Sequence, residues 1–542
     1  MALAQRRRYA PRPLFQLCLS AYDSMRATLS DNRPYDAPIH MLDDDSLINV
    51  FYFCRPVALD HEGIGLDGPS KENFKLERDL ERWWYKVAQV CQRWRYLMLA
   101  SPSYLKLFLV CTNGTPLADM LAHLPPLPLI INYVVGYRLG YRNRRRLTAK
   151  DEEAILLALQ HRDRVRRIHL RIPIAKLQRV VVAMGDHFPI LEYVYIAPYG
   201  KHERLMLPRT FQAPRLRHLI LQGFAYPIGS LLLATPAGLV TLSLENILPS
   251  TYFHPSDLLP WLALMPQLET LGISFRSPVL DRDIGRRLLR SPTLTPLTLP
   301  NLRWFEFQGV SAYLEALLAR LIAPLLQRLK ISFFFQLNYT VPHLLQFMST
   351  AENLKFSSAR VIFKSEAVVV TALPRKGDWL YDASKLVVRC ELPGLSSRVN
   401  STARFFNALH QVFSPVEHLT LDHDGLFSLG GVIATQWREL LRLFPNVKNL
   451  AVENGLELFG KLSRSLLMDD IEPPLELFPE LNELRIFGGG DTGDKFKPFI
   501  NARQVSGHPI RLVVPDSERS TDDPIHAHAS THIHHDYDHL RR

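Results

Sequence analysis

The sequence contains few cysteines, lacks long apolar runs and carries no recognisable catalytic motif. Its 5 cysteines among 542 residues are irregularly spaced, which excludes a disulfide framework and favours a reducing compartment, the cytoplasm or the nucleus. The most apolar stretch, residues 314–326, includes two charged residues and falls short of the ~20 apolar residues that cross a membrane. Gly-x-Ser-x-Gly, P-loop, dinucleotide-binding and His-Glu-x-x-His motifs are missing. We therefore expect a protein that is not an enzyme, with no catalytic residues, cofactor or metal.

Glycine is also scarce relative to proline, with 26 Gly against 39 Pro. This surplus predicts many short elements ended by turns. Apolar residues make up 47% of the chain and charged residues 22%, which is globular usage and excludes wholesale disorder. We expect disorder only in a basic leader, 1–36, and in an acidic tail, 515–542. The tail carries six histidines that could bind Zn²⁺ or Ni²⁺, but its polarity favours a disordered segment over a metal site: His526, His528, His532, His534, His535 and His539.

A short apolar motif recurs along most of the chain. An apolar residue is followed by two more, three and five positions later, as in Leu268, Leu271 and Ile273. Twelve copies begin at residues 165, 191, 216, 239, 268, 302, 326, 351, 383, 416, 447 and 481. A proline lies two residues before the motif in seven of them: Pro189, Pro214, Pro266, Pro300, Pro324, Pro445 and Pro479. The repetition predicts one structural unit per copy.

The motif predicts a strand, because its last two apolar positions alternate and face the same side of a sheet. Amphipathic stretches between copies predict helices, as over 436–444. We therefore predict an α/β fold in which a leucine-rich-repeat-like solenoid, an irregular horseshoe, occupies 112–514. The asparagine that usually follows such a strand is missing, and an ordinary α/β domain with leucine-rich strands is the alternative.

Residues 37–111 stand apart from the repeats and predict a small helical module with an inserted loop at 60–80. Acidic residues at 43–45 suit a helix start, and an apolar face follows it. A second helix is predicted over 82–100 as one continuous element. Two apolar faces in so small a unit predict either a partner protein or a role as the cap of the solenoid.

The module resembles an F-box. The resemblance rests on Leu42-Asp-Asp-Asp-Ser-Leu-Ile-Asn-Val-Phe51 and on Val87-Ala-Gln-Val-Cys-Gln-Arg-Trp94. The wider runs 81–94 and 109–116 resemble a group of basidiomycete, that is fungal, F-box proteins. Two positions depart from the family motif, because Asp43 stands where it has proline and Ser46 where it has leucine.

The resemblance implies a substrate receptor of a ubiquitin ligase. The module would bind a Skp-type adaptor, which tethers it to a cullin–RING ligase, while the repeats bind an unidentified protein target. By position, the residues that form or support the adaptor face are Leu42, Leu47, Ile48, Val50, Phe51, Val87, Val90, Cys91, Trp94 and Leu97. Some of them must belong to the core of the module, and the sequence does not divide the two sets.

A basic patch over 138–171 suggests an alternative function. The formal net charge of the chain is +11, and much of it gathers here: Arg138, Arg142, Arg144, Arg145, Arg146, Arg164, Arg166 and Arg167. Tyr133, Tyr137 and Tyr141 are interspersed among the first of these, as in surfaces that stack bases. The patch could bind nucleic acid or an acidic partner, with the module as a solenoid cap. A solvated surface explains the same residues, and we favour it over nucleic acid.

Overall fold

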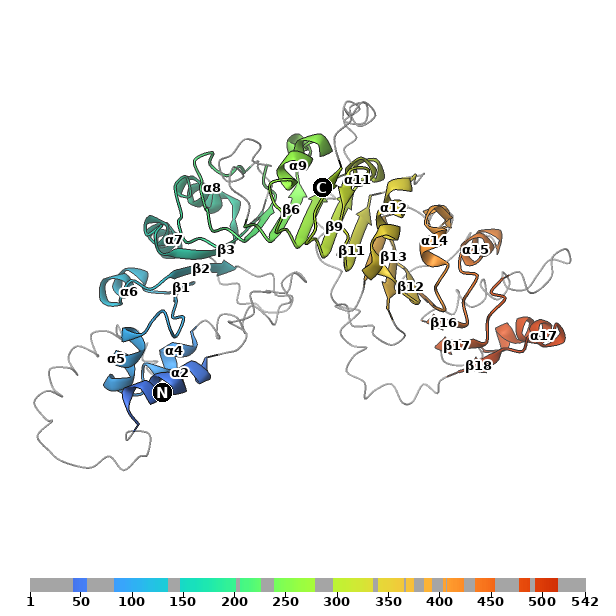
Figure 1. Ribbon diagram of the computed structural model, residues 1–542, viewed down its shortest axis with the longest axis horizontal. Helices are drawn as coiled ribbons and strands as arrows, with labels where there is room; N and C mark the ends of the chain where they lie inside the picture. Colours follow the sequence, from blue (N-terminus) through green and yellow to red (C-terminus); the bar gives the residue numbers. More distant parts are fainter. Residues whose placement is uncertain are drawn as a thin grey trace, which may run out of the picture. The chain divides into compact units, whose positions relative to one another are not determined.

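A computed structural model describes two compact units, Met1–Leu107 and Phe108–Arg542 (Figure 1). The first is the helical unit and the second is the sheet unit. The residues that the structure describes are 42–55, 82–134, 147–200, 205–225, 238–277, 296–334, 340–364, 367–374, 385–391, 403–405, 407–423, 434–453, 477–487 and 493–514. The predicted leader, the inserted loop and the tail therefore lie outside the described residues.

The helical unit contains three described helices. They are α2 (Asp44–Cys54), α4 (Trp83–Val87) and α5 (Gln92–Ala100). Helices α2 and α5 pack together, with the rings of Phe51 and Trp94 5.0 Å apart at their centroids. The prediction of one continuous helix over 82–100 is wrong, because the backbone of Cys91 is extended and begins a new helix.

The sheet unit is built on one sheet of 16 strands. In spatial order these are β1 (Leu109–Cys111), β2 (Leu129–Val134), β3 (Val165–Pro173), β4 (Tyr193–Tyr199), β5 (His218–Gln222), β6 (Thr241–Ile247), β7 (Thr270–Phe275), β9 (Trp304–Gly309), β11 (Arg328–Phe333), β14 (Leu386–Glu391), β13 (Ala367–Leu373), β12 (Ser358–Phe363), β15 (His418–His423), β16 (Asn449–Glu453), β17 (Glu483–Phe487) and β18 (Arg511–Val513). Two short strands, β8 (Leu297–Thr298) and β10 (Leu321–Ile322), form a separate pair.

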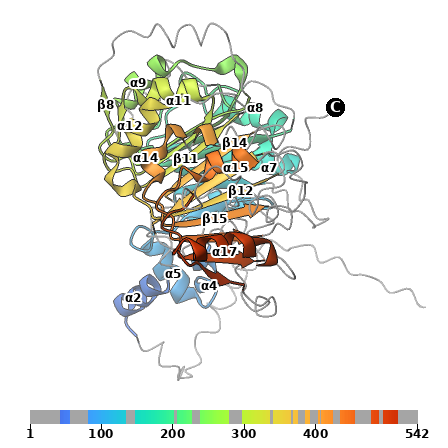
Figure 2. The same ribbon diagram turned by 90° about the vertical axis from the view of Figure 1, so that its right-hand side faces the viewer.

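Helices lie between the strands in sequence and along one side of the sheet (Figure 1). They are α6 (Leu117–His123), α7 (Ala149–Gln160), α8 (Ile174–Ala183), α9 (Pro255–Leu262), α11 (Ser311–Leu318), α12 (Pro342–Thr350), α14 (His410–Phe413), α15 (Ala434–Leu441) and α17 (Lys497–Val505), with 3₁₀ turns η4 (Pro249–Thr251), η5 (Glu352–Leu354) and η7 (Gly493–Phe496). Several successive helices contact one another, as α7 does α8 and α11 does α12. Figure 2 views the unit from the end that carries α17. No helix among the described residues has the length and apolar character needed to span a bilayer.

The motif places its apolar side chains in a continuous ladder. Its second positions pair directly across neighbouring parallel strands: Ile168, Val194, Leu219, Leu242, Leu271, Phe305, Leu329 and Leu386. All of these side chains are buried in the core. The residues between them alternate onto the opposite side of the sheet, which we call the open face. The prediction of repeated strands in a mixed α/β fold is confirmed for these copies.

One copy of the motif is misplaced. Ala351, Leu354 and Phe356 are buried, but Leu354 ends η5 and no strand includes them. The strand is β12, where Ala359 and Val361 pair with the motif positions Leu419 and Leu421 of β15. The copy therefore begins at Phe356, five residues later than the sequence predicted.

The strand order also reverses once, which the sequence did not predict. Strand β13 pairs antiparallel with both β12 and β14, so these three strands lie in reverse chain order between β11 and β15. The predicted boundary between the two parts of the chain also shifts. Residues 109–111, predicted to belong to the helical module, form β1 and pair with β2 in the sheet unit.

Candidate interaction site

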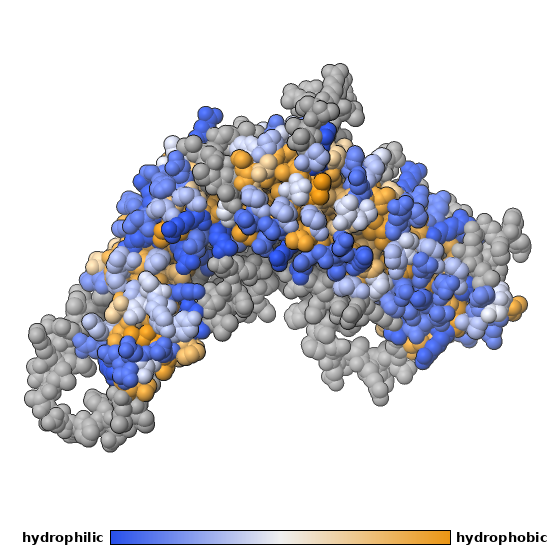
Figure 3. Space-filling view, in the orientation of Figure 1, coloured by the Kyte–Doolittle hydropathy of each residue, from blue (hydrophilic) through white to orange (hydrophobic). Residues whose placement is uncertain are grey.

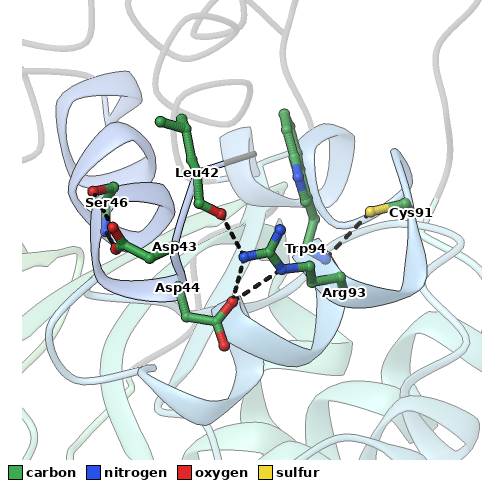
Figure 4. Close-up of polar contacts among 7 residues, drawn as sticks. All are labelled: Leu42, Asp43, Asp44, Ser46, Cys91, Arg93 and Trp94. Atoms are coloured by element: carbon green, nitrogen blue, oxygen red, sulfur yellow. Dashed lines mark hydrogen bonds and ion pairs between the residues drawn. The ribbon is translucent and has the colours of Figure 1, made fainter. Parts of the chain in front are cut away.

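The helical unit begins with a capped helix. Asp43 is the N-cap of α2, and its carboxylate accepts hydrogen bonds from the backbone N–H of Ser46 at 2.7 Å and from its hydroxyl at 3.1 Å (Figure 4). These bonds stabilise the ionised carboxylate and lower the pKa of Asp43. The two positions that depart from the F-box motif therefore bond to each other and satisfy a donor that every helix start leaves open.

Arg93 joins the two halves of the motif. Its Nη2 donates to Asp44 Oδ1 and to the carbonyl oxygen of Leu42, both at 2.6 Å, and its Nε donates to Asp44 Oδ1 at 2.9 Å (Figure 4). A guanidinium can reach several acceptors at once because its donors form a rigid fork. One side chain of α5 therefore fixes the start of α2.

The break between α4 and α5 is closed by side chains. Cys91 Sγ accepts a hydrogen bond from Trp94 N–H at 3.4 Å and so caps α5 (Figure 4). Arg95 Nε donates to the carbonyl oxygen of Ala88 at the end of α4, at 3.0 Å. Val90 lies in this break and is 58% exposed. The break thus presents Val90 at the surface, where a continuous helix had been expected.

Burial divides the ten residues that the resemblance assigned to the adaptor face. Leu47, Phe51 and Leu97 are buried in the core of the unit. The half-buried residues are Ile48, Val87, Cys91 and Trp94. The exposed ones are Leu42, Val50 and Val90. Of the ten residues, these three expose the largest fraction of their surface and are the most accessible to a partner.

Three further exposed side chains were not in the predicted set. They are Phe53, Tyr96 and Tyr104, with Phe53 exposed by 83%. Phe53 lies three residues after Val50 on α2, so the two are neighbours on the helix surface. Val50 lies at the edge of the face that carries the buried Leu47 and Phe51, and Phe53 lies farther from that face. That spacing was readable from the sequence, but Phe53 falls just past the motif. Figure 3 shows hydrophobic side chains on the surface of the helical unit around these helices.

Most of the predicted basic patch lies outside the described residues, namely Arg138, Arg142, Arg144, Arg145 and Arg146. Those that are described make contacts within the sheet unit. Arg164 Nε donates to the carbonyl oxygen of Leu127 at 3.0 Å, and burial lowers the pKa of its guanidinium. Arg166 forms an ion pair with Glu192 at 2.7 Å, and Arg167 stacks on the ring of Tyr193.

The one tyrosine of this group that the structure describes is not a base-stacking platform. Tyr133 on β2 is completely buried in the sheet unit, so its ring is not accessible to a nucleic acid. Tyr137 and Tyr141 lie outside the described residues. The aromatic part of the nucleic-acid prediction therefore has no support at Tyr133.

The part of the chain that the structure describes contains no cluster of three or more metal-ligating side chains. The histidines of the tail lie outside it. The described cysteines are thiols that form no disulfide with one another: Cys54, Cys91, Cys111 and Cys390.

Comparisons with known proteins identify no family. No protein-family model and no curated protein matches the chain. A crystal structure of a yeast complex of Rad7 and Elc1 is similar with a TM-score of 0.28 and 14% identity, over 88% of this chain and 94% of that one. Function is therefore argued from the residues of this chain alone.

Proposed function

We propose that the chain is a substrate-recognition subunit of a Skp/cullin/F-box-type ubiquitin ligase. The helical unit binds a Skp-type adaptor, and the sheet unit, an irregular leucine-rich-repeat-like solenoid or horseshoe, binds the protein target. In this role the chain performs no chemistry. It raises the effective concentration of a target lysine near a ubiquitin-loaded enzyme.

The observation that carries this proposal is the assembly of the two F-box-like segments into one unit. Residues 42–51 and 87–94 are separated in sequence, yet Arg93 bonds to Asp44 and to Leu42, and Trp94 packs on Phe51. Both segments serve the same small core and leave apolar side chains outside it. An exposed apolar surface of this kind supports a binding role.

Phe53 is the anchor that this proposal predicts. Burying a phenylalanine side chain stabilises a complex by about 1.5–3 kcal/mol, and aromatic anchors dominate many interfaces. Because Phe53 is 83% exposed, nearly all of that contribution is available to a partner. Removing its ring should weaken adaptor binding about tenfold to a hundredfold.

The test is co-purification of the full chain with a recombinant Skp-type adaptor, followed by titration calorimetry. The variant Phe53→Ala with Val90→Ala should lose binding. The matched control is Val182→Ala on α8, which also truncates a residue that is 77% exposed but lies in the sheet unit. Wild-type chain that shows no adaptor binding, or a double variant that binds as tightly as wild type, would contradict the proposal.

A further inference from the structure

The sheet unit ends in a short segment, residues 493–514, which contains η7, α17 and β18 and which we call the terminal flap. Strand β18 is the last of the 16 strands, and its only partner among the described strands is β17. Strand β17 pairs with β16 over five residues, Glu483–Phe487, but with β18 over only the first three of them. Figures 1 and 2 show α17 at this end of the sheet. The flap is therefore joined to the sheet along one short edge.

The terminal flap buries less apolar surface than the strands before it. Leu512 of β18 continues the core ladder of Leu450 and Leu484, which are completely buried, but is itself only half-buried. Val505 and Val514 of the flap are 89% and 44% exposed. At the other end of the sheet, in contrast, every residue of β1 is completely buried. Apolar burial thus stabilises the flap less than it stabilises the interior strands.

A buried arginine lies on the inner face of α17. Phe496, Phe499 and Arg503 are spaced three and four residues apart, and all three side chains are buried. Arg503 thus stands where the helical pattern calls for a third apolar residue. Its Nη2 donates to the carbonyl oxygens of Pro479 and Leu481 at 3.2 and 3.4 Å. In the part of the chain that the structure describes, its Nε and Nη1 have no hydrogen-bond partner.

The guanidinium of Arg503 is a buried charge without a counter-ion among the described residues. Two other buried charged groups of the sheet unit do have one: Asp422 pairs with Arg360 at 2.7 Å, and Glu152 pairs with Arg179 at 2.6 Å. Burial lowers the pKa of Arg503, yet the group stays charged because the ordinary pKa of a guanidinium lies above about 12. Two long hydrogen bonds do not offset the free energy of burying an unpaired charge. Docking of the flap is therefore opposed by the desolvation of Arg503.

We propose that the terminal flap undocks reversibly from β17 in the folded protein, and that the buried charge of Arg503 sets how often it does so. Elements with little buried apolar surface open at a lower free energy than the rest of a fold. In the docked state the sheet ends at β18. In the undocked state it ends at β17, one edge of that strand is exposed, and Arg503 is hydrated. This inference concerns the sheet unit alone and does not depend on the proposed function.

The test is hydrogen–deuterium exchange of the full chain, with protection compared between peptides from the flap and peptides from β15 and β16. In wild type, the amides of α17 and β18 should exchange roughly a hundredfold faster than those of β15 and β16. Arg503→Met removes the charge and keeps an unbranched side chain in its place. It should slow exchange of the flap about tenfold, because no charge is then buried on docking. Arg503→Leu, a shorter apolar replacement, should act in the same direction.

Two variants serve as controls. Arg511→Met removes an exposed charge from the open face of β18, so it changes the net charge of the flap by the same amount without altering a buried group. It should leave the exchange of α17 unchanged. Arg503→Lys keeps the charge and loses the forked donors, so its flap should exchange at least as fast as that of wild type. Simple fraying of a chain end would not respond to the charge at position 503.

The proposal is overturned if α17 and β18 of wild type are as well protected as β16, because the flap would then be firmly docked. It is also overturned if Arg503→Met leaves exchange of the flap unchanged or speeds it, since the two carbonyl bonds would then anchor the flap. A slowing by Arg511→Met as large as that by Arg503→Met would assign the effect to net charge, and would contradict the role of burial. Exchange of the helical unit should be equal in all variants and provides the internal standard.

Discussion

Phe51 and Phe53 are two residues apart on α2, yet substitution by alanine should affect folding at the first position and binding at the second. Phe51 is 1% exposed and packs edge-on against Trp94, with ring centroids 5.0 Å apart. Phe53 is 83% exposed. Phe51→Ala should therefore destabilise the helical unit, while Phe53→Ala should leave it folded and reduce adaptor binding only.

The size of the effect follows from burial. Truncating a buried phenylalanine to alanine costs about 3–5 kcal/mol, because the apolar contacts are lost and a cavity remains. Domains of ordinary size are stable by about 5–15 kcal/mol, and a small unit lies near the lower end. Phe51→Ala therefore removes most of the stability of the helical unit. Phe53→Ala should change it by no more than about 0.5 kcal/mol, as at other exposed sites.

Hydrogen–deuterium exchange of the full chain measures this difference unit by unit. A loss of about 3 kcal/mol should speed exchange of the amides of α2 and α5 roughly a hundredfold in Phe51→Ala. Exchange in the sheet unit should be unchanged in both variants, which provides an internal control. Equal protection of α2 in Phe51→Ala and wild type, or faster exchange in Phe53→Ala, would refute the assignment of core and surface.

Two further predictions concern the sheet unit. Glu315 of α11 accepts from the N–H groups of His343 (2.8 Å) and Leu344 (2.9 Å) at the start of α12, and burial raises its pKa. Because ionisation costs more in the folded state, wild-type stability should fall as pH rises through the raised pKa. That loss should be missing in Glu315→Gln, so the denaturant midpoint of wild type should fall relative to that of the variant as pH rises; a constant difference would contradict this. A Cβ on Gly309 would lie 2.7 Å from the Phe307 ring, so Gly309→Ala should cost about 1–3 kcal/mol and lower the thermal midpoint. Gly238→Ala should leave the thermal midpoint unchanged, because a Cβ there meets nothing within 4 Å. Equal thermal midpoints for the two variants would contradict the packing argument.

The regular part of the sheet could be predicted from sequence because strand alternation is a local property. The spacing of Leu242 and Leu244 already requires both to face one side, and Leu271 and Ile273 repeat it. Once two such strands are parallel neighbours, the register that buries all four side chains pairs Leu242 with Leu271, as observed. No long-range information was needed beyond the repetition itself.

The position of β12 and the antiparallel pairing of β13 could not be predicted in this way. Ala351, Leu354 and Phe356 are buried, so the apolar pattern was detected correctly, but a 3₁₀ turn buries side chains as well as a strand does. Strand β13 pairs antiparallel with β12 and β14, and that choice depends on the residues that join them and on competition with β15 for the same edge. Pairing of this kind is decided by the whole chain.

For the candidate site too, the sequence indicated which residues share a helix face but not what that face packs against. Helical spacing put Leu47 and Phe51 on one face, but it did not say whether that face meets α5 or a partner. The contact of Phe51 with Trp94 answers this, and it removes both residues from the accessible surface. Phe53 then becomes the largest apolar side chain available on α2.

The departures from the F-box motif also acquire a physical meaning. Taken separately, Asp43 in place of proline and Ser46 in place of leucine each remove an apolar group from the start of α2. In the structure the Asp43 carboxylate accepts both donors of Ser46, so the two changes form one cap. A proline at 43 could not accept these bonds, and a leucine at 46 could not donate the second. The first turn thus uses its polar groups for itself, and we infer that adaptor affinity comes from the apolar side chains beyond it, Val50 and Phe53 above all.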